Sequence, residues 1–303
     1  MKLDRPWTRC VIASGSIAFA TLMVAPVAQA ASQRRQAEPA FSIRLEDQIL
    51  ATLRYLPVSF KPTVRKITPP TTTTTTTTTT ITTTTNPVTT TTTIPPTTTT
   101  TAPKKTKHVS PTKLQKGTFP WRFNSLPSAL RALWRVGTNN VVLQGALMRF
   151  QSVQGMITTG AMDGATWTSL VHAALSDQRD PMSYNDVVVD QALPEKLKLY
   201  QNGKVTFVTL VNTGVASAPT ENGTYPVYVR YVTTTMSGFY SDGSSYSDPG
   251  IPWVSYFHGG DALHGFIRSS YGFPQSLGCV EMPFVDAQTL WPHTPIGTLV
   301  TVQ

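Results

Sequence analysis

Between Thr68 and Pro103 the chain is almost entirely threonine and proline, and this restricts folded structure to the sequence on either side. Such a segment has almost nothing to bury, so it cannot offset the conformational entropy lost on folding. We therefore expect a disordered linker over residues 68–116. It would serve as a spacer, although low-complexity drift in a segment under little constraint gives the same composition.

Residues 1–30 have the pattern of a secretory signal peptide. A basic start precedes a mostly apolar stretch, and Ala28-Gln29-Ala30 fits the small-x-small cleavage rule. We expect export and a mature chain that starts near Ala31. A retained N-terminal membrane anchor is the alternative, but the apolar stretch is short for a membrane span.

The chain carries a formal net charge of +9 at pH 7. A basic exported protein suits an anionic wall or membrane surface, whereas improved solubility is the simpler explanation of the same charge. The sequence has no basic stripe interleaved with aromatic residues and no zinc-finger spacing, so it does not indicate a nucleic-acid partner.

Helical periodicity occurs on both sides of the threonine-rich segment. Residues 43–55 place apolar side chains on one face, which predicts a short amphipathic helix within an N-terminal segment, 31–67. This helix is too small to fold alone, so it either docks on the following domain or stays loose. Residues 117–176 repeat apolar side chains at helical spacing around turn glycines and predict a small helical bundle.

Strand periodicity replaces helical periodicity over residues 184–303. Asn202-Gly203 lies between two β-rich runs and predicts a hairpin, because both residues tolerate positive φ. Residues 225–232 alternate apolar side chains on one face as a single strand would, and residues 297–302 predict a closing strand. Residues 283–291 predict a short helix. We thus expect a multidomain chain, with a helical bundle followed by a mostly-β domain containing one or two short helices.

Cys279 is the only cysteine that remains once the expected leader, which contains Cys10, is removed. Exported cysteines normally pair in disulfides, so an unpaired one indicates a reactive thiol. A thiol is only weakly ionised at neutral pH and needs a base, for which imidazole is the usual group. His258 and His264 lie in one stretch upstream of the thiol, and spacing alone does not rank them.

Leu263-His264-Gly265 is followed, after ten residues, by Ser276-Leu277-Gly278-Cys279-Val280. Together these strings resemble the signature of the L,D-transpeptidase catalytic family, the YkuD-type domain. Further matches run through residues 184–303, at Gln201–Val205, Asn212-Thr213-Gly214, Thr220–Tyr225 and Ile296–Val300.

The resemblance implies that Cys279 is the nucleophile and His264 the general base. Backbone amides near Gly278 and Cys279 would form the oxyanion hole, with Ser276 and Gly265 holding motif positions. Neither a metal nor an organic cofactor is implied, because base, nucleophile and backbone donors suffice for acyl transfer.

Two positions depart from the family pattern. Leu277 stands where the family usually has a second histidine, and Glu281 where it commonly has arginine or asparagine. The lost histidine is not the general base, so catalysis can persist without it. We expect Glu281, Arg268 and His258 as candidate substrate contacts.

The pattern from Val142 to Leu170 resembles the three-helix peptidoglycan-binding domain found on many wall enzymes. It implies that residues 117–176 form a three-helix bundle that holds peptidoglycan. Thr159 stands where that family usually has aspartate, and a helical spacer without a ligand is the alternative.

These resemblances imply an exported bacterial cell-wall enzyme, a cysteine acyltransferase that forms 3→3 cross-links between peptidoglycan stem peptides. The Cys279 thiolate would attack a donor tetrapeptide, D-alanine would leave, and an acceptor amine would resolve the thioester. Hydrolysis by the same site, an L,D-carboxypeptidase activity, is one alternative, and an inactive wall-binding protein is another. Expected partners are donor and acceptor stem peptides, cell-wall glycan and carbapenem inhibitors.

Overall fold

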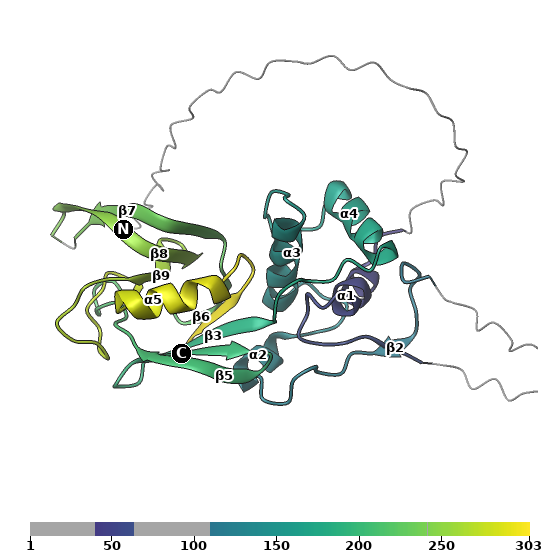
Figure 1. Ribbon diagram of the computed structural model, residues 1–303, viewed down its shortest axis with the longest axis horizontal. Coiled ribbons are helices and arrows are strands. Elements are labelled where there is room, and N and C mark those ends of the chain that lie inside the picture. The colour runs from purple at the N-terminus through teal and green to yellow at the C-terminus, as the bar shows by residue number, and fades with distance from the viewer. Residues whose placement is uncertain (1–39, 64–109, 241) are drawn as a thin grey trace, which may run out of the picture. The chain divides into compact units, whose positions relative to one another are not determined.

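The computed structural model describes residues 40–63, 110–240 and 242–303. The expected leader and most of the expected linker lie outside these residues. None of the helices within them is long and apolar enough to cross a membrane. The described elements comprise a helical unit and a mostly-β domain (Figure 1).

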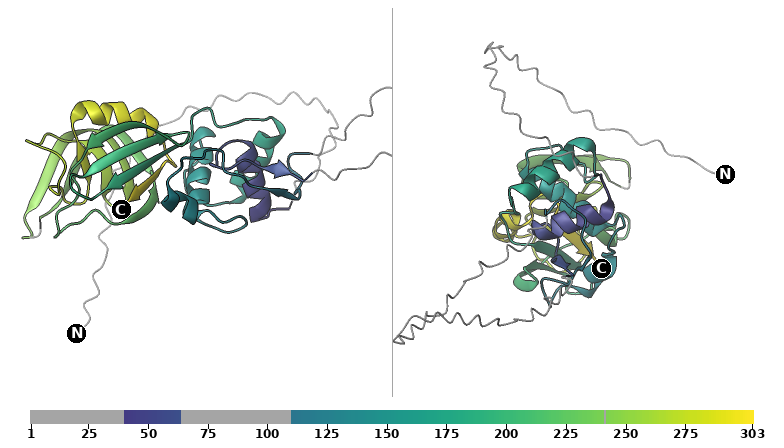
Figure 2. Two further views of the ribbon diagram at one scale, coloured as in Figure 1. Left: turned by 90° about the horizontal axis from the view of Figure 1, so that it is seen from below. Right: turned by 90° about the vertical axis from the view of Figure 1, so that its right-hand side faces the viewer.

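Four helices build the hydrophobic core of the helical unit, and Figures 1 and 2 show α1 lying among the others. They are α1 (Ile43–Thr52), α2 (Ser128–Leu133), α3 (Val141–Val153) and α4 (Gly164–Leu175). The side chains of Ser42, Asn140 and Asp163 cap α1, α3 and α4 by accepting a backbone N–H from the first turn. Sequence periodicity located the apolar faces of α3 and α4 correctly.

The core is not the expected three-helix bundle of residues 117–176, because α1 also contributes to it. Leu45, Ile49 and Leu50 of α1 are almost fully buried in the same cluster as Phe150 of α3. Burying one such side chain stabilises the fold by about 1.5–3 kcal/mol. The helix before the threonine-rich segment is therefore docked, as an integral part of the helical unit.

The flanks of the threonine-rich segment pair with each other. Strand β1 (Lys61–Pro62) runs antiparallel to β2 (Gly117–Thr118), and the Thr63 N–H donates to the Lys116 carbonyl at 2.8 Å. The segments on the two sides of residues 64–109 therefore belong to one folded unit. Most of the expected spacer lies outside the described residues, and its role stays a prediction.

Residues 110–116 were expected in the linker, but they pack against α1. The Gln48 side chain holds them, because its amide donates to the carbonyls of Pro111 (3.2 Å) and Lys113 (3.0 Å). Its amide oxygen accepts the Gln115 N–H at 2.8 Å. Residues 110–116 are therefore part of the folded unit.

The β domain contains a five-stranded and a four-stranded sheet. The first has the order β5 (Lys204–Leu210), β4 (Lys196–Gln201), β3 (Asn185–Asp190), β11 (Leu299–Val302), β6 (Gly223–Pro226). The second has the order β10 (Val280–Met282), β9 (Asp261–Gly265), β8 (Ser245–His258), β7 (Val229–Phe239). Only the β3–β11 and β9–β10 pairs are parallel.

The core of this domain lies between the two sheets, with α5 (Phe284–Leu290) and the short η1 (Trp291–His293) beside them. Its largest buried side chains are those of Leu197, Leu199, Phe257, Leu263, Met282 and Leu290. Helix α5 packs on β8 and β9, and Figure 1 shows it beside these strands. A Cβ at Gly265 would lie 2.8 Å from the Phe284 ring, so glycine permits this close packing.

Three local predictions for the β domain are confirmed and one is wrong. Asn202 (φ 50°) and Gly203 (φ 77°) join β4 to β5, and the short helix and closing strand are present as α5 and β11. Residues 225–232 are not one strand, because the chain passes from β6 in one sheet to β7 in the other. Val227 lies between β6 and β7 and is fully buried. The alternation of apolar side chains therefore does not reveal that the chain changes sheet at this point.

Two glycines let the helical unit approach the β domain closely. A Cβ on Gly145 of α3 would lie 2.7 Å from the Gly297 carbonyl oxygen, and one on Gly297 would lie 2.2 Å from that of Gly145. Leu299 of β11 is part of the helical core. Residues 145 and 297 are therefore restricted to glycine by backbone contact.

Candidate active site

Cys279 and His264 are brought together by a pair of parallel strands. Cys279 directly precedes β10, and His264 lies in β9 opposite Glu281. Both side chains line a cavity of about 260 Å³, here called the Cys279 cavity. The strand register therefore gives the thiol and the imidazole a common space, as the family resemblance implied.

The His264 ring has one defined tautomer. Its Nδ1 lies 3.0 Å from the Gly265 carbonyl oxygen, which can only accept a hydrogen bond, so Nδ1 carries the proton. The lone pair is then on Nε2. Burial, with the ring 2% exposed, lowers the pKa of His264 below its usual 6.5. The imidazole is therefore neutral at pH 7 and able to accept a proton.

The Cys279 thiol is protonated in the resting site. Desolvation is the main cause that raises the pKa of Cys279 to about 12, with Asp261 and Glu281 acting in the same direction. The Ala262 backbone N–H opposes them. Because the thiol does not ionise unaided at neutral pH, attack requires proton transfer to a base.

The turn that presents Cys279 is fixed by side-chain hydroxyls. The Ser276 hydroxyl donates to the Cys279 carbonyl at 2.5 Å and accepts the Gly278 N–H at 3.2 Å. The Thr220 hydroxyl donates to the Gly278 carbonyl at 2.7 Å and accepts the Gly214 N–H at 2.9 Å. These bonds hold the thiol in one position without using its sulfur.

Of the backbone N–H groups of Gly278 and Cys279, which were expected to form the oxyanion hole, one is free to donate. The Gly278 N–H is already used by Ser276, whereas the Cys279 N–H has no hydrogen-bond partner within the described residues. A backbone N–H beside the nucleophile is a common donor to a developing oxyanion. The participation of Cys279 N–H in such a hole stays a prediction.

Glu195 supports the turn that presents Cys279 through hydrogen bonds to Thr213. The sequence analysis did not identify Glu195. Its buried carboxylate accepts the backbone N–H and the hydroxyl of Thr213, each at 2.7 Å. The Thr213 carbonyl in turn accepts the N–H groups of Gln275 and Ser276, each at 2.9 Å. Nothing in the sequence around Glu195 signals this role, because the contact joins segments far apart in the chain.

Arg268 and Glu281 form a bidentate ion pair in the wall of the Cys279 cavity. The Arg268 Nε and one terminal nitrogen donate to the two Glu281 oxygens, at 2.7 and 2.9 Å. Leu277 also lines the cavity and is 38% exposed. Glu281 therefore presents to the cavity a carboxylate that is paired with Arg268. Leu277 contributes an apolar surface at the position where the family usually has a histidine.

His258 does not line the Cys279 cavity. Its ring stacks on Tyr225 with centroids 4.2 Å apart, and its Nδ1 lies 3.7 Å from the Asp261 carboxylate. Of the three candidate substrate contacts, the structure brings Arg268 and Glu281 to the thiol and leaves His258 to one side.

The long β7–β8 hairpin supplies cavity residues that sequence reasoning did not find. Met236, Tyr240, Tyr246 and Asp248 come from this hairpin or its turn and line the Cys279 cavity. The residues that the structure describes contain no group of three or more His, Cys, Asp or Glu side chains arranged to hold a metal ion. The chemistry available at this site is that of a thiol, an imidazole, a carboxylate and an arginine–glutamate pair.

Replacing Gly278 by alanine should destabilise the protein by about 1–3 kcal/mol, the usual cost of a backbone forced into a sparsely populated region. Gly278 has φ +113°, and an added Cβ would lie 2.4 Å from Asp261 Oδ1. Urea denaturation measures the change. Gly260→Ala is the matched control, because its Cβ would meet open space. Equal stability of the two variants would contradict the prediction.

A buried neutral imidazole and an unpaired thiol in one cavity define a site of the kind used for covalent acyl transfer. Residues 185–302 match the sequence profile of the L,D-transpeptidase catalytic domain, YkuD. Residues 185–302 therefore contain a YkuD-type L,D-transpeptidase catalytic domain, as the cysteine motif predicted. A search of curated proteins found no match to the chain.

Solved structures with a similar fold include three L,D-transpeptidases. An enzyme from Mycobacterium smegmatis is 17% identical, with a TM-score of 0.36, over 40% of this chain and 59% of that one. The E. faecium catalytic domain is 25% identical, with a TM-score of 0.37, over 41% and 99%. L,D-transpeptidase 3 from Mycobacterium tuberculosis, solved with a faropenem-derived adduct, is 18% identical, with a TM-score of 0.37, over 40% and 60%. The chain thus spans less than two thirds of the length of the two mycobacterial proteins.

Proposed function

We propose that this protein is an exported cell-wall enzyme that cross-links peptidoglycan stem peptides through a thioester on Cys279, giving 3→3 links. The observation that carries the proposal is the shared cavity, in which a protonated thiol faces the same space as a neutral imidazole with a free Nε2. An acyl transferase needs this pairing, and a wall-binding protein does not.

In the proposed reaction, His264 Nε2 takes the thiol proton while the Cys279 sulfur attacks the carbonyl carbon of the third residue of a donor tetrapeptide. The Cys279 N–H stabilises the oxyanion. The C–N bond to the terminal D-alanine breaks, and its amine leaves with the proton from His264. The side-chain amine of an acceptor stem then attacks the thioester, His264 takes a proton from it, and the thiol is regenerated.

The helical unit and the basic charge fit a wall location under this proposal. The unit would hold peptidoglycan while the β domain reacts, and the net charge of +9 favours an anionic polymer. Retention by insoluble peptidoglycan, compared between the intact protein and variants in the helical unit, would test this part separately from the chemistry.

Mass spectrometry of the purified protein with a tetrapeptide muropeptide tests the central claim. We expect an acyl adduct on Cys279 and loss of D-alanine. With an acceptor present, a 3→3 dimer supports transpeptidation, whereas release of a tripeptide alone indicates an L,D-carboxypeptidase. A carbapenem should also acylate Cys279, because the thiol can attack its strained lactam carbonyl and the lactam C–N bond then opens. No adduct from either compound would indicate an inactive domain.

Asp248→Asn should raise the KM for the acceptor amine by about tenfold, the effect of losing about 1.4 kcal/mol of ground-state binding. The Asp248 carboxylate lines the Cys279 cavity and makes no hydrogen bond or ion pair within the described residues. It is thus available to an incoming ammonium group. Acylation by a carbapenem should not change, because that step uses no acceptor.

The matched control is Asp242→Asn, at the turn of the same hairpin. The Asp242 carboxylate bonds Ser244 and does not line the cavity, so this change should leave the acceptor KM unaltered. Unchanged acceptor kinetics in Asp248→Asn would remove Asp248 from the acceptor site. A parallel loss of acylation would place it in the donor site instead.

A further inference from the structure

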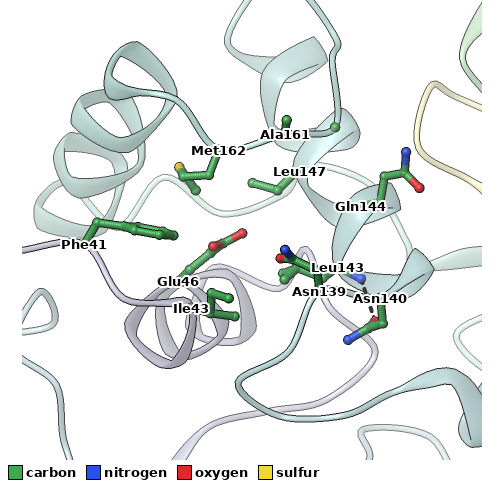
Figure 3. Close-up of a pocket in the computed structure, with 11 residues that line it drawn as sticks. Phe41, Ile43, Glu46, Asn139, Asn140, Leu143, Gln144, Leu147, Ala161 and Met162 are labelled. Atoms are coloured by element: carbon green, nitrogen blue, oxygen red, sulfur yellow. Dashed lines mark hydrogen bonds between the residues drawn. The ribbon is translucent and has the colours of Figure 1, made fainter.

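The helical unit contains a second cavity, of about 550 Å³, which shares no residue with the Cys279 cavity. It lies between α1, the start of α3 and the turn before α4 (Figure 3). We call it the Glu46 cavity. Nothing in the proposed transpeptidase chemistry uses it, so its lining requires a separate explanation.

The floor of this cavity carries a buried acid without a partner. Glu46 is 1% exposed, and its Oε1 has no hydrogen-bond partner among the described residues. Figure 3 shows the carboxyl group pointing into the cavity, toward the space between Phe41 and Leu143. Burying a polar group without a partner costs free energy, so such a group in a native fold requires a reason.

The neighbouring acid, Asp47, has a structural role in this helix. Asp47 is equally buried, but one of its oxygens accepts the Gly137 N–H at 2.6 Å and so fixes the loop before α3. Glu46 makes no such bond to any residue that the structure describes. Its orientation toward the cavity is therefore not explained by the fold alone.

Burial first, and the Asp47 charge second, raise the pKa of Glu46 to about 8. The empty cavity thus holds a largely protonated acid at pH 7. None of the residues that line the cavity is lysine, arginine or histidine. A cation that entered would meet no competing positive charge among these lining residues, and it would favour the carboxylate form.

The other residues that line the cavity indicate what kind of group could accompany a cation there. They are apolar around Glu46, through Phe41, Ile43, Leu143, Leu147 and Met162. The Asn140 amide is already used in capping α3 and in bonding the Arg135 and Thr138 carbonyls. The opening is therefore suited to a methylene arm.

We propose that the Glu46 cavity binds a primary ammonium group carried on a short aliphatic arm, with Glu46 as its counter-ion. Two sources share this chemistry: a free soluble amine, and the diamino-acid side chain of a wall peptide. The second source rests on the proposed function, whereas the binding of the amine does not.

Isothermal titration calorimetry of the full chain with n-hexylamine hydrochloride and with hexan-1-ol tests the proposal. The two probes have arms of equal length and differ in charge. We expect the amine to bind at least tenfold more tightly than the alcohol. Glu46→Gln should lower the affinity for the amine at least tenfold and leave that for the alcohol unchanged, because glutamine keeps the size and loses the charge.

Asp177→Asn is the matched control, since Asp177 is an exposed carboxylate of the same unit that pairs with Arg179 away from the cavity. It should bind both probes as the wild type does. A second variant, Ala161→Leu, narrows the cavity without touching Glu46 and should weaken both probes. Equal affinity of the wild type for amine and alcohol, or unchanged amine binding in Glu46→Gln, would overturn the proposal.

Sacculi with intact amines and sacculi with N-acetylated amines distinguish the two sources. Stronger retention of the wild type on intact sacculi, lost in Glu46→Gln, assigns the cavity to a wall peptide. Equal retention on both assigns it to a free amine. Acylation of Cys279, followed by mass spectrometry in the same samples, reports separately on the proposed function, because Glu46 lies outside the Cys279 cavity.

Discussion

Cys279→Ala should reduce cross-linking to background, a loss of at least about a thousandfold, because no covalent intermediate can form without the sulfur. The fold should persist, since the change removes one atom from a partly buried side chain beside a small apolar cluster. Product analysis with a tetrapeptide donor measures the first effect. The second is followed by the melting temperature.

Ser276→Ala is an informative companion to this variant. It keeps the thiol but removes the hydroxyl that bonds the Cys279 carbonyl and the Gly278 N–H, so activity should fall without vanishing. Cross-linking by Cys279→Ala at the wild-type rate would rule out the thioester mechanism. Adduct formation on any other residue would do the same.

His264→Ala should slow acylation of Cys279 by at least about a hundredfold, the lower end of what a general base contributes. The thiol pKa of about 12 makes the base necessary, because only a very small fraction of thiol ionises at pH 7 without it. Stopped-flow measurement of carbapenem acylation gives the rate. His258→Ala is the matched control, and it should cost much less because His258 does not line the Cys279 cavity.

The same histidine sets the acid side of the pH profile. Burial lowers the His264 pKa below 6.5, so the neutral base persists at pH 6.5 and acylation should decline only at lower pH. The folded state also binds the proton less tightly than the unfolded state, so stability is lost as pH falls below 6.5. A larger loss in His258→Ala than in His264→Ala would mean that the other histidine is the base.

Local sequence rules recovered the parts of the fold that depend on neighbouring residues. Asn202-Gly203 gave the β4–β5 hairpin because its φ values are intrinsic to those two residues. The Cys279 motif indicated the turn that presents the thiol, because that turn is built from consecutive residues. The role of Cys279 as nucleophile stays a prediction. The pairing of His264 with Cys279 followed from the family resemblance, and the parallel β9–β10 register supplies its physical basis.

Contacts between distant segments were not predictable in this way. Glu195 supports the turn that presents Cys279 from a distant segment, and Asp248 lines the Cys279 cavity from a hairpin whose length gives no functional signal. Glu46 occupies a polar position of the helix predicted over residues 43–55, yet it is 1% exposed and lines a cavity between α1, α3 and the turn before α4. The sequence also left open whether α1 docks, because the contacts that hold it join segments on the two sides of the threonine-rich stretch.

The pairing of β1 with β2 makes the helical unit a complex of two sequence segments that need no peptide bond between them. A protease cut anywhere in residues 64–109 would leave two polypeptides, each contributing side chains to one core. Leu45, Ile49, Leu50 and Leu53 would hold the N-terminal piece in place, at about 1.5–3 kcal/mol for each buried side chain. Proteolysis there would thus convert the helical unit into a non-covalent heterodimer and would not by itself separate the β domain from the N-terminal piece.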